Sequence, residues 1–274
     1  MHPRRTPANE RVALAELKEQ VQAPRYVTGH EFMVTSPVAD LMRDPDGGMD
    51  CQVLFGTGFL VLERQNGWVF GQSQADGYCG YLRESQLSPP KAITHKVSAL
   101  VSHIYAAADI KSQRHAFLPF GARLSGTQNT AGFLQIGDAG FVPLQHLSPV
   151  DTVVDDFVSV IETFTGLAYL WGGNSPLGMD CSGAVQLALT AAGVSCPRDT
   201  DMQIAELGTA LTASDDLRRG DLVFWQGHIG AMMDDRTLIH ANAFHMKVAQ
   251  EPLATAKARI LASGGGMITA IKRL

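Results

Sequence analysis

The sequence predicts two small all-β domains followed by an α+β domain. Between Tyr26 and Pro149, short runs of Val, Phe, Leu and Tyr alternate with Gly, Asn, Asp and Pro, as in small β domains. Residues 80–87 are echoed sixty positions later by residues 140–147, and after Pro149 the apolar residues take helical spacing. The expected boundaries are an N-terminal extension at 1–25, β domains at 26–90 and 91–150, and the α+β domain at 151–274.

The first half of the chain contains a clear signal for a β hairpin. Asn66-Gly67 lies between the strand-like segments 55–62 and 68–70, and both turn residues accept a positive φ at low cost. The repeated pattern resembles two tandem bacterial SH3-like barrels, with a boundary near Pro89-Pro90. Because roughly 60 residues is close to the smallest size for an independent core, two such barrels fit this length.

The second half contains the helical signals. Apolar residues recur at helical spacing from Asp151 to Gly166, with carboxylates elsewhere on the helical wheel, which predicts an amphipathic helix. Residues 182–192 are small and apolar almost all round, which predicts a buried helix that Gly193 ends. Antiparallel strands are expected at 221–225, 228–234 and 237–241.

Composition argues against several classes of protein. Of the 274 residues, 45% are hydrophobic and 18% are charged, which is typical of an ordered protein. The net charge of -5 and the lack of a long basic cluster argue against binding to nucleic acid, and no apolar run is long enough to span a membrane. Residues 1–21 lack the apolar stretch of a secretory signal, so we expect a cytoplasmic protein. The four cysteines form no CxxC pair, which argues against a zinc ribbon or a thioredoxin-like redox motif. A reducing compartment fits four free thiols.

Cys181 is the candidate nucleophile. It falls where a loop becomes the predicted buried helix, and the N-terminus of a helix favours a thiolate. We therefore expect a lowered pKa for this thiol. A buried, inert cysteine is the alternative at such a position, because free cysteine is among the most buried residue types.

His228 and His240 are the candidate partners of that thiol. If their strands form a hairpin that turns near Asp234-Asp235, facing residues have numbers that sum to about 468, and the two histidines face each other. Since side chains alternate along a strand, a slip of one residue would place them on opposite faces. If both side chains lie on the same face, His240 can orient His228, and the three residues form a catalytic arrangement of nucleophile, base and orienting residue. A zinc site made of Cys181, His228 and His240 is a less favoured alternative, because no fourth ligand is evident.

Five segments in order resemble the catalytic domain of the NlpC cysteine peptidases. They are Tyr169-Leu-Trp-Gly-Gly173, Asp180-Cys-Ser-Gly183, Gly220-Asp-Leu-Val-Phe-Trp225, His228-Ile-Gly230 and Ile239-His-Ala241. The resemblance implies a papain-like α+β fold with no metal or organic cofactor. It also implies that Cys181 is the nucleophile, His228 the general base and acid and His240 the orienter, with the hydroxyl of Tyr169 facing the thiol.

The layout of two SH3-like barrels and a peptidase resembles the γ-D-glutamyl-L-diamino-acid endopeptidases of cell-wall peptides. This resemblance implies a small muropeptide substrate with a free N-terminal L-alanine. It also implies substrate contacts from Asp180, Ser182, Asp199, Thr200 and Tyr78.

Asp180 has two interpretations. As an ammonium partner it would bind the free amine of the substrate, and as a helix cap it would stabilise the helix that starts at Cys181; the two roles can coexist. Acyl transfer or amidase action at the same site, and a non-catalytic wall-binding protein, are the alternative functions. The sequence does not specify the oligomeric state.

Overall fold

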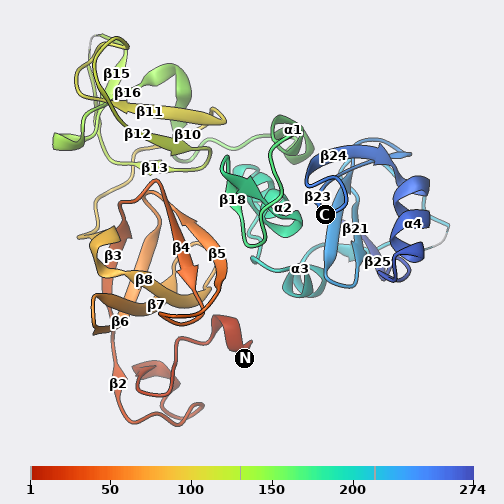
Figure 1. The fold of residues 1–274 in the computed structure, drawn as a ribbon, viewed down its shortest axis with the longest axis horizontal. Coiled ribbons are helices and arrows are strands. Elements are labelled where there is room, and N and C mark those ends of the chain that lie inside the picture. The colour runs from red at the N-terminus through yellow and green to blue at the C-terminus, as the bar shows by residue number, and fades with distance from the viewer. Residues whose placement is uncertain (1, 130, 213) are drawn as a thin grey trace. The chain divides into compact units, whose positions relative to one another are not determined.

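The computed structural model describes residues 2–129, 131–212 and 214–274, and divides the chain into two compact units (Figure 1). The first unit runs to Thr152 and the second runs from Val153 to Leu274. This division lies two residues beyond the boundary expected at 150/151. The two units are described separately below.

The N-terminal segment of the first unit packs onto the β domain that follows it. Val12 is fully buried and lies in one apolar cluster with Leu62, Phe70 and Tyr81. Within the described residues 2–25, the segment expected as an extension thus contributes Val12 to the core of this β domain. Its elements are η1 (Pro3–Arg5), β1 (Ala13–Leu14) and η2 (Ala15–Leu17), with β1 paired in parallel to β2 (Tyr26–Val27).

The first β domain is a seven-stranded sheet with the order β5-β4-β8-β7-β6-β3-β9. The predicted hairpin is confirmed, because Gln65 pairs with Trp68, and Asn66 and Gly67 have φ values of 53° and 76°. The elements are β3 (His30–Val34), β4 (Val38–Met42), β5 (Met49–Leu54), β6 (Gly58–Gln65), β7 (Trp68–Ser73), β8 (Cys79–Arg83), η3 (Glu84–Gln86) and β9 (Leu87–Ser88).

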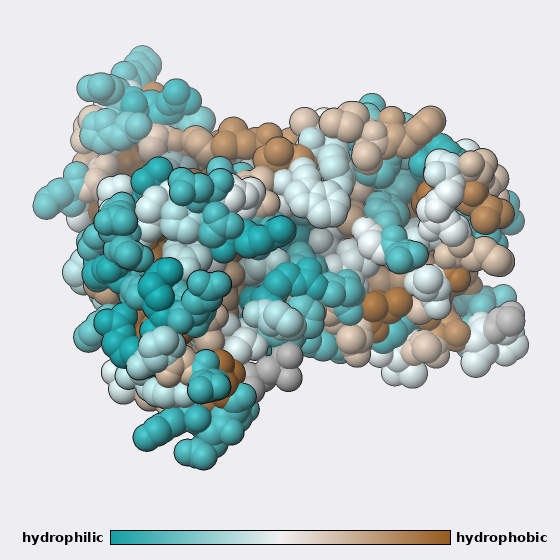
Figure 2. All heavy atoms as spheres, turned by 60° about the horizontal axis from the view of Figure 1, so that its bottom comes forward, coloured by the Kyte–Doolittle hydropathy of each residue, from teal (hydrophilic) through white to brown (hydrophobic). Residues whose placement is uncertain are grey.

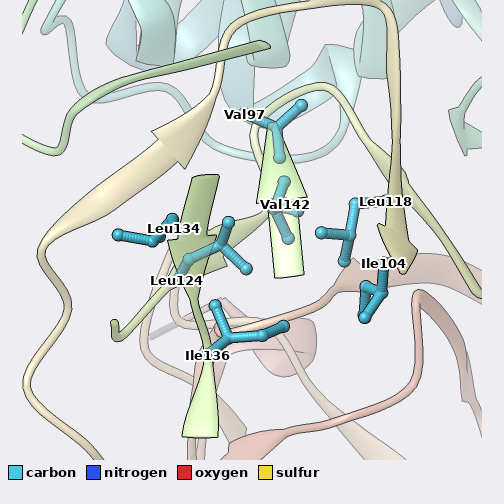
Figure 3. Close-up of a cluster of buried hydrophobic side chains, with 8 residues drawn as sticks. Val97, Ile104, Leu118, Leu124, Leu134, Ile136 and Val142 are labelled. Atoms are coloured by element: carbon cyan, nitrogen blue, oxygen red, sulfur yellow. The ribbon is translucent and has the colours of Figure 1, made fainter. Parts of the chain in front are cut away.

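The second β domain has a three-stranded sheet, β13-β10-β17, and a five-stranded sheet, β12-β11-β16-β15-β14. Val97, Ile104, Leu118, Leu124, Leu134, Ile136 and Val142 form its core (Figure 3). The strands are β10 (His95–Val97), β11 (Val101–Tyr105), β12 (Arg114–Pro119), β13 (Arg123–Leu124), β14 (Thr127–Gln128), β15 (Phe133–Gln135), β16 (Phe141–Pro143) and β17 (Leu147–Pro149), with the short helices η4 (Gly137–Ala139) and η5 (Leu144–His146).

The sequence repeat corresponds to a structural repeat. In the first β domain, β8 leads through η3 to β9, and in the second β16 leads through η5 to β17. The short helices at 84–86 and 144–146 lie sixty residues apart, which is the spacing read from the sequence.

The second unit is a six-stranded antiparallel sheet with helices packed against it, in the order β20-β25-β21-β22-β23-β24. Helix α2 packs against β22 and β23, and α1 packs against α2. The helices are α1 (Phe157–Thr163), α2 (Cys181–Ala191), α3 (Thr200–Glu206) and α4 (Leu253–Ala262). The strands are β18 (Asn174–Ser175), β19 (Gly178–Met179), β20 (Thr209–Ala210), β21 (Leu222–Trp225), β22 (His228–Met232), β23 (Thr237–Asn242), β24 (Lys247–Pro252) and β25 (Ala270–Arg273).

Both predicted helices differ in their bounds from the sequence prediction. The helix expected over 151–166 begins only at Phe157, because the carboxylate of Asp156 accepts a hydrogen bond from Val158 N–H and caps it there. The buried helix starts at Cys181 and ends one residue earlier than expected, with Gly193 just beyond it at a φ of 77°.

The register of the β22–β23 hairpin also differs from the prediction. Ala231 pairs with Ile239 and Met232 with Leu238, so facing residues have numbers that sum to 470 rather than 468. His228 and His240 are therefore not directly opposite each other. A shift of two residues leaves each side chain on its predicted face, because the side-chain period of a strand is two.

The helices within the described ranges are too short to cross a bilayer as apolar spans. Hydrophilic, intermediate and hydrophobic side chains are mixed over the face seen in Figure 2.

Candidate active site

Cys181 is the first residue of α2, as the sequence predicted. Asp180 caps this helix through a 2.7 Å hydrogen bond from Gly183 N–H. The sulfur lies 4.0 Å from Thr200 Oγ1 and is hydrogen-bonded by the backbone N–H of Ile229, the residue after His228. The nucleophile candidate thus lies at the start of α2, next to the start of β22.

The expected lowering of the Cys181 pKa is wrong for this structure. Burial raises the pKa of the thiol to about 11, and the negative charge of Asp180 acts in the same direction. The hydrogen bonds from Ile229 and Thr200 lower the pKa by less. Desolvation outweighs the field of the helix N-terminus here, because only 7% of Cys181 is exposed. The resting thiol is therefore protonated at neutral pH.

The two histidines are brought together as predicted. His228 Nε2 lies 2.7 Å from His240 Nδ1, which is hydrogen-bond distance. The ring centroids are 5.0 Å apart, and His240 is 2% exposed. His240 can therefore orient His228, the role that the sequence pattern predicts for it.

Glu251 joins this pair and was not predicted. Its Oε1 lies 2.8 Å from His240 Nε2 and also forms an ion pair with Arg259 of α4. His240 pairs with Ala249 on β24, so Glu251, two residues further on, projects from the same face. The available sequence signal was a single carboxylate within β24, and only the strand register connects it to His240.

Both histidines are neutral near pH 7. Burial lowers the pKa of His228 to about 4, with a smaller effect from the positive charge of Arg259. Burial lowers the pKa of His240 to about 2, and His228 and Arg259 add to this shift. A neutral His228 can accept a proton from a protonated thiol, which is the function of a general base.

Tyr169 lies close enough to the site to interact electrostatically with Cys181. Burial raises the pKa of its hydroxyl well above the usual value, and the nearby Cys181 and Asp180 raise it further. Its backbone N–H donates to Met246 O at 2.9 Å, which ties the segment to the loop after β23. Tyr169 therefore keeps its proton and can act as a hydrogen-bond donor.

Asp180 belongs to a buried ion pair beneath the start of α2. Arg198, 1% exposed, donates to both carboxylate oxygens at 2.9 and 2.8 Å, and also to Ser182 Oγ at 2.8 Å. Asp180 accepts further hydrogen bonds from Gly172 N–H, Gly183 N–H and Ser182 Oγ. The capping interpretation of Asp180 is thus confirmed, and its charge is already matched by Arg198.

The other predicted substrate contacts lie in two places. Asp199 and Thr200 begin α3, and Asp199 is half-buried and makes no side-chain capping bond to this helix. Thr200 faces the sulfur of Cys181. Tyr78 belongs to the first unit, where it precedes β8 and is 3% exposed, and its contact with substrate stays a prediction.

Among the residues that the structure describes, one group has the spacing of metal ligands. The potential ligand atoms of His240, His245 and Glu251 lie within 4.8 Å of one another. The alternative zinc set of Cys181, His228 and His240 does not meet this spacing. Because Glu251 already pairs with Arg259, the positive charge of that guanidinium opposes a cation at the first group.

The fold and the site together define a papain-like cysteine peptidase: a thiol at the start of a buried helix and a histidine pair on the adjacent sheet. The NlpC/P60 family model matches residues 166–260, and the model of the bacterial dipeptidyl-peptidase SH3 domain matches residues 41–87. The chain belongs to the NlpC/P60 family of cysteine peptidases.

Similar proteins support this assignment over most of the chain. The γ-D-glutamyl-L-lysine dipeptidyl-peptidase of Bacillus subtilis is 30% identical over 218 residues, covering 72% of this chain and 73% of that protein. Dipeptidyl-peptidase 6 of Lysinibacillus sphaericus is 27% identical over 241 residues, which cover 77% of this chain and 87% of that protein. The crystal structure of an NlpC/P60 family protein from Bacillus cereus has a TM-score of 0.75 at 19% identity, covers 89% of this chain and 99% of that one, and shows the same fold.

Proposed function

We propose that this enzyme hydrolyses the γ-D-glutamyl–diamino-acid bond of small peptidoglycan stem peptides that carry a free N-terminal L-alanine. The proposal places the reaction in the cytoplasm, in the recycling of cell-wall peptides. The observation that carries the chemistry is the thiol of Cys181 at the start of α2, hydrogen-bonded by the backbone N–H of Ile229, which follows His228, and the contact of His228 with His240. The names of the Bacillus and Lysinibacillus relatives support the substrate class. Four free cysteines fit a reducing compartment.

The first half of the reaction forms an acyl-enzyme. As the sulfur of Cys181 attacks the γ-carbonyl carbon of D-glutamate, the neutral imidazole of His228 takes the thiol proton. Backbone N–H groups at the start of α2 and the hydroxyl of Tyr169 stabilise the negative charge that develops on the carbonyl oxygen. His228 then returns the proton to the amine of the diamino acid as the C–N bond breaks.

The second half of the reaction releases the product. His228, neutral again, takes a proton from water as the water oxygen attacks the thioester carbon. The C–S bond breaks, the sulfur regains its proton, and the free γ-carboxyl of D-glutamate leaves. No further reactant is required, because one water molecule is consumed for each bond cleaved.

We propose that Asp199 contributes to recognition of the substrate amine, a role for which Asp180 also stays a candidate. The carboxylate of Asp180 caps α2 and accepts five hydrogen bonds from the protein, two of them from Arg198. Asp199 is half-buried and adjoins Thr200, whose hydroxyl lies 4.0 Å from the sulfur of Cys181. A carboxylate at this place can bind an ammonium group near the scissile bond through a charge-assisted hydrogen bond.

Mass spectrometry of the products from a panel of stem peptides tests the function. We expect the parent enzyme to convert L-Ala-γ-D-Glu-L-Lys, or its diaminopimelate counterpart, to L-Ala-D-Glu and the free diamino acid. The Cys181→Ala variant should fold but form no product, because the covalent nucleophile is missing. A parent enzyme that cleaves none of the peptides, or a Cys181→Ala variant that cleaves as fast as the parent, would contradict the proposal.

The same panel tests the role of Asp199. N-acetylation of the L-alanine should slow the parent enzyme strongly, because it removes the ammonium group. Asp199→Asn should lower the rate on the free-amine peptide by roughly tenfold for each 1.4 kcal/mol of interaction lost, with little effect on the acetylated peptide. Equal losses on both peptides would show that Asp199 does not bind the amine.

A further inference from the structure

We infer that Glu251 is a positioning residue that fixes the tautomers of both histidines, so that Nδ1 of His228 is free to accept the thiol proton. This inference rests on the proposed role of His228 as the general base. The residues concerned lie on three neighbouring strands, β22, β23 and β24, and on helix α4 (Figure 1).

The hydrogen bonds form a single directed chain. A carboxylate only accepts hydrogen bonds, and the carboxylate of Glu251 also forms an ion pair with Arg259. At 2.8 Å from that carboxylate, His240 Nε2 must carry its proton, and a neutral His240 then has a bare Nδ1. Since His240 Nδ1 accepts, His228 Nε2 must donate across the 2.7 Å contact. His228 Nδ1 is thereby left with its lone pair.

A hydrogen bond in the opposite direction, from His240 to His228, would leave His228 unable to act as a base. If His240 carried its proton on Nδ1, it would donate to His228 Nε2, and a neutral His228 would then hold its own proton on Nδ1. Neither nitrogen of His228 could accept a proton from Cys181, because one would be protonated and the other engaged as an acceptor. The tautomer of His240 therefore decides whether the site can react.

The surroundings of Glu251 support this role over a merely structural one. Glu251 is 8% exposed and His240 is 2% exposed, so water does not substitute readily for either partner. His245, the other imidazole nearby, lies 4.0 Å from the Glu251 oxygen but only 3.0 Å from Asn242 Oδ1. It therefore does not replace His240 as the donor to the carboxylate.

The Glu251→Gln variant tests the inference, with Glu162→Gln as its matched control. Glutamine keeps the size of the side chain but carries no negative charge, so the oxygen that accepts from both Arg259 and His240 holds them more weakly. Glu162 also pairs with an arginine of the same unit, Arg219, at 2.8 Å, but far along the chain from both histidines. We expect Glu251→Gln to lower kcat by on the order of ten- to a hundredfold with KM nearly unchanged, and Glu162→Gln to change neither.

Nitrogen-15 NMR of the imidazoles reads the tautomers directly, without substrate. In the parent enzyme, His228 and His240 should both carry the proton on Nε2, and Glu251→Gln should populate the Nδ1–H form of each. A parent enzyme with His228 protonated on Nδ1 would overturn the inference, even if Glu251→Gln failed to fold. So would a folded Glu251→Gln variant with parental kcat and tautomers. Correct tautomers in a parent enzyme that cleaves no stem peptide would instead contradict the proposed substrate alone.

Discussion

The two histidines of the site differ in what their removal takes away. In the proposed mechanism His228 carries the proton in every step, whereas His240 holds the ring of His228 through one 2.7 Å hydrogen bond. We expect His228→Ala to lower kcat by about a thousandfold or more, as in other catalytic triads. His240→Ala should lower it by less, on the order of ten- to a hundredfold, because the base itself remains. Steady-state kinetics on the preferred peptide measures both, and a larger loss for His240→Ala would require the roles to be exchanged.

Helices α1 and α2 are both capped by an aspartate that pairs with an arginine, but one ion pair is exposed and the other is buried. Asp156 caps α1 and pairs with Arg219 at the surface, whereas Asp180 caps α2 and pairs with the buried Arg198. Asparagine can replace either cap but neither charge. Comparing Asp156→Asn with Asp180→Asn therefore isolates the effect of burial on an ion pair.

We expect Asp180→Asn to lower the free energy of unfolding by about 3 to 5 kcal/mol, because it leaves Arg198 buried without its carboxylate. Asp156→Asn should cost less than about 1 kcal/mol, because its ion pair is exposed to water. Urea unfolding of both variants measures the difference. Similar losses in the two variants would mean that the buried charge of Arg198 finds another partner.

At the scale of the whole molecule, the buried histidines make stability depend on pH. In the unfolded chain an imidazole takes up its proton near pH 6.5, but in the folded protein the pKa values are about 4 for His228 and about 2 for His240. Between the folded-state and unfolded-state pKa values, the unfolded chain binds more protons than the folded protein. Unfolding therefore becomes more favourable as the pH falls below 6.5.

Calorimetry should show this acid sensitivity in the second unit. We expect Tm to fall by about 4 °C or more between pH 6.5 and pH 4.5, in addition to any effect of the carboxylates. His240→Asn should make the dependence of Tm on pH less steep, because it removes one of the titrating groups. A slope that is unchanged in this variant would show that His240 does not contribute to the pH dependence.

Much of the fold was predictable because its signals are local. The Asn66-Gly67 turn, the repeat that became two strand–short-helix–strand units, and the buried helix before Gly193 each depend on a few consecutive residues. The position of Cys181 at a helix start followed from the same kind of signal. Even the common face of His228 and His240 was predictable, since a register error of two residues preserves it.

The family, the order of the β and α+β domains and the proximity of His228 to His240 could thus be predicted without coordinates. The fold was needed to see that Glu251 extends the hydrogen-bond chain, that Arg198 matches the charge of Asp180, and that burial raises the pKa of Cys181. The physical reason is the range of the interactions. Strand register, burial and ion pairing depend on residues distant in the chain, whereas turns, caps and periodicity depend on neighbours.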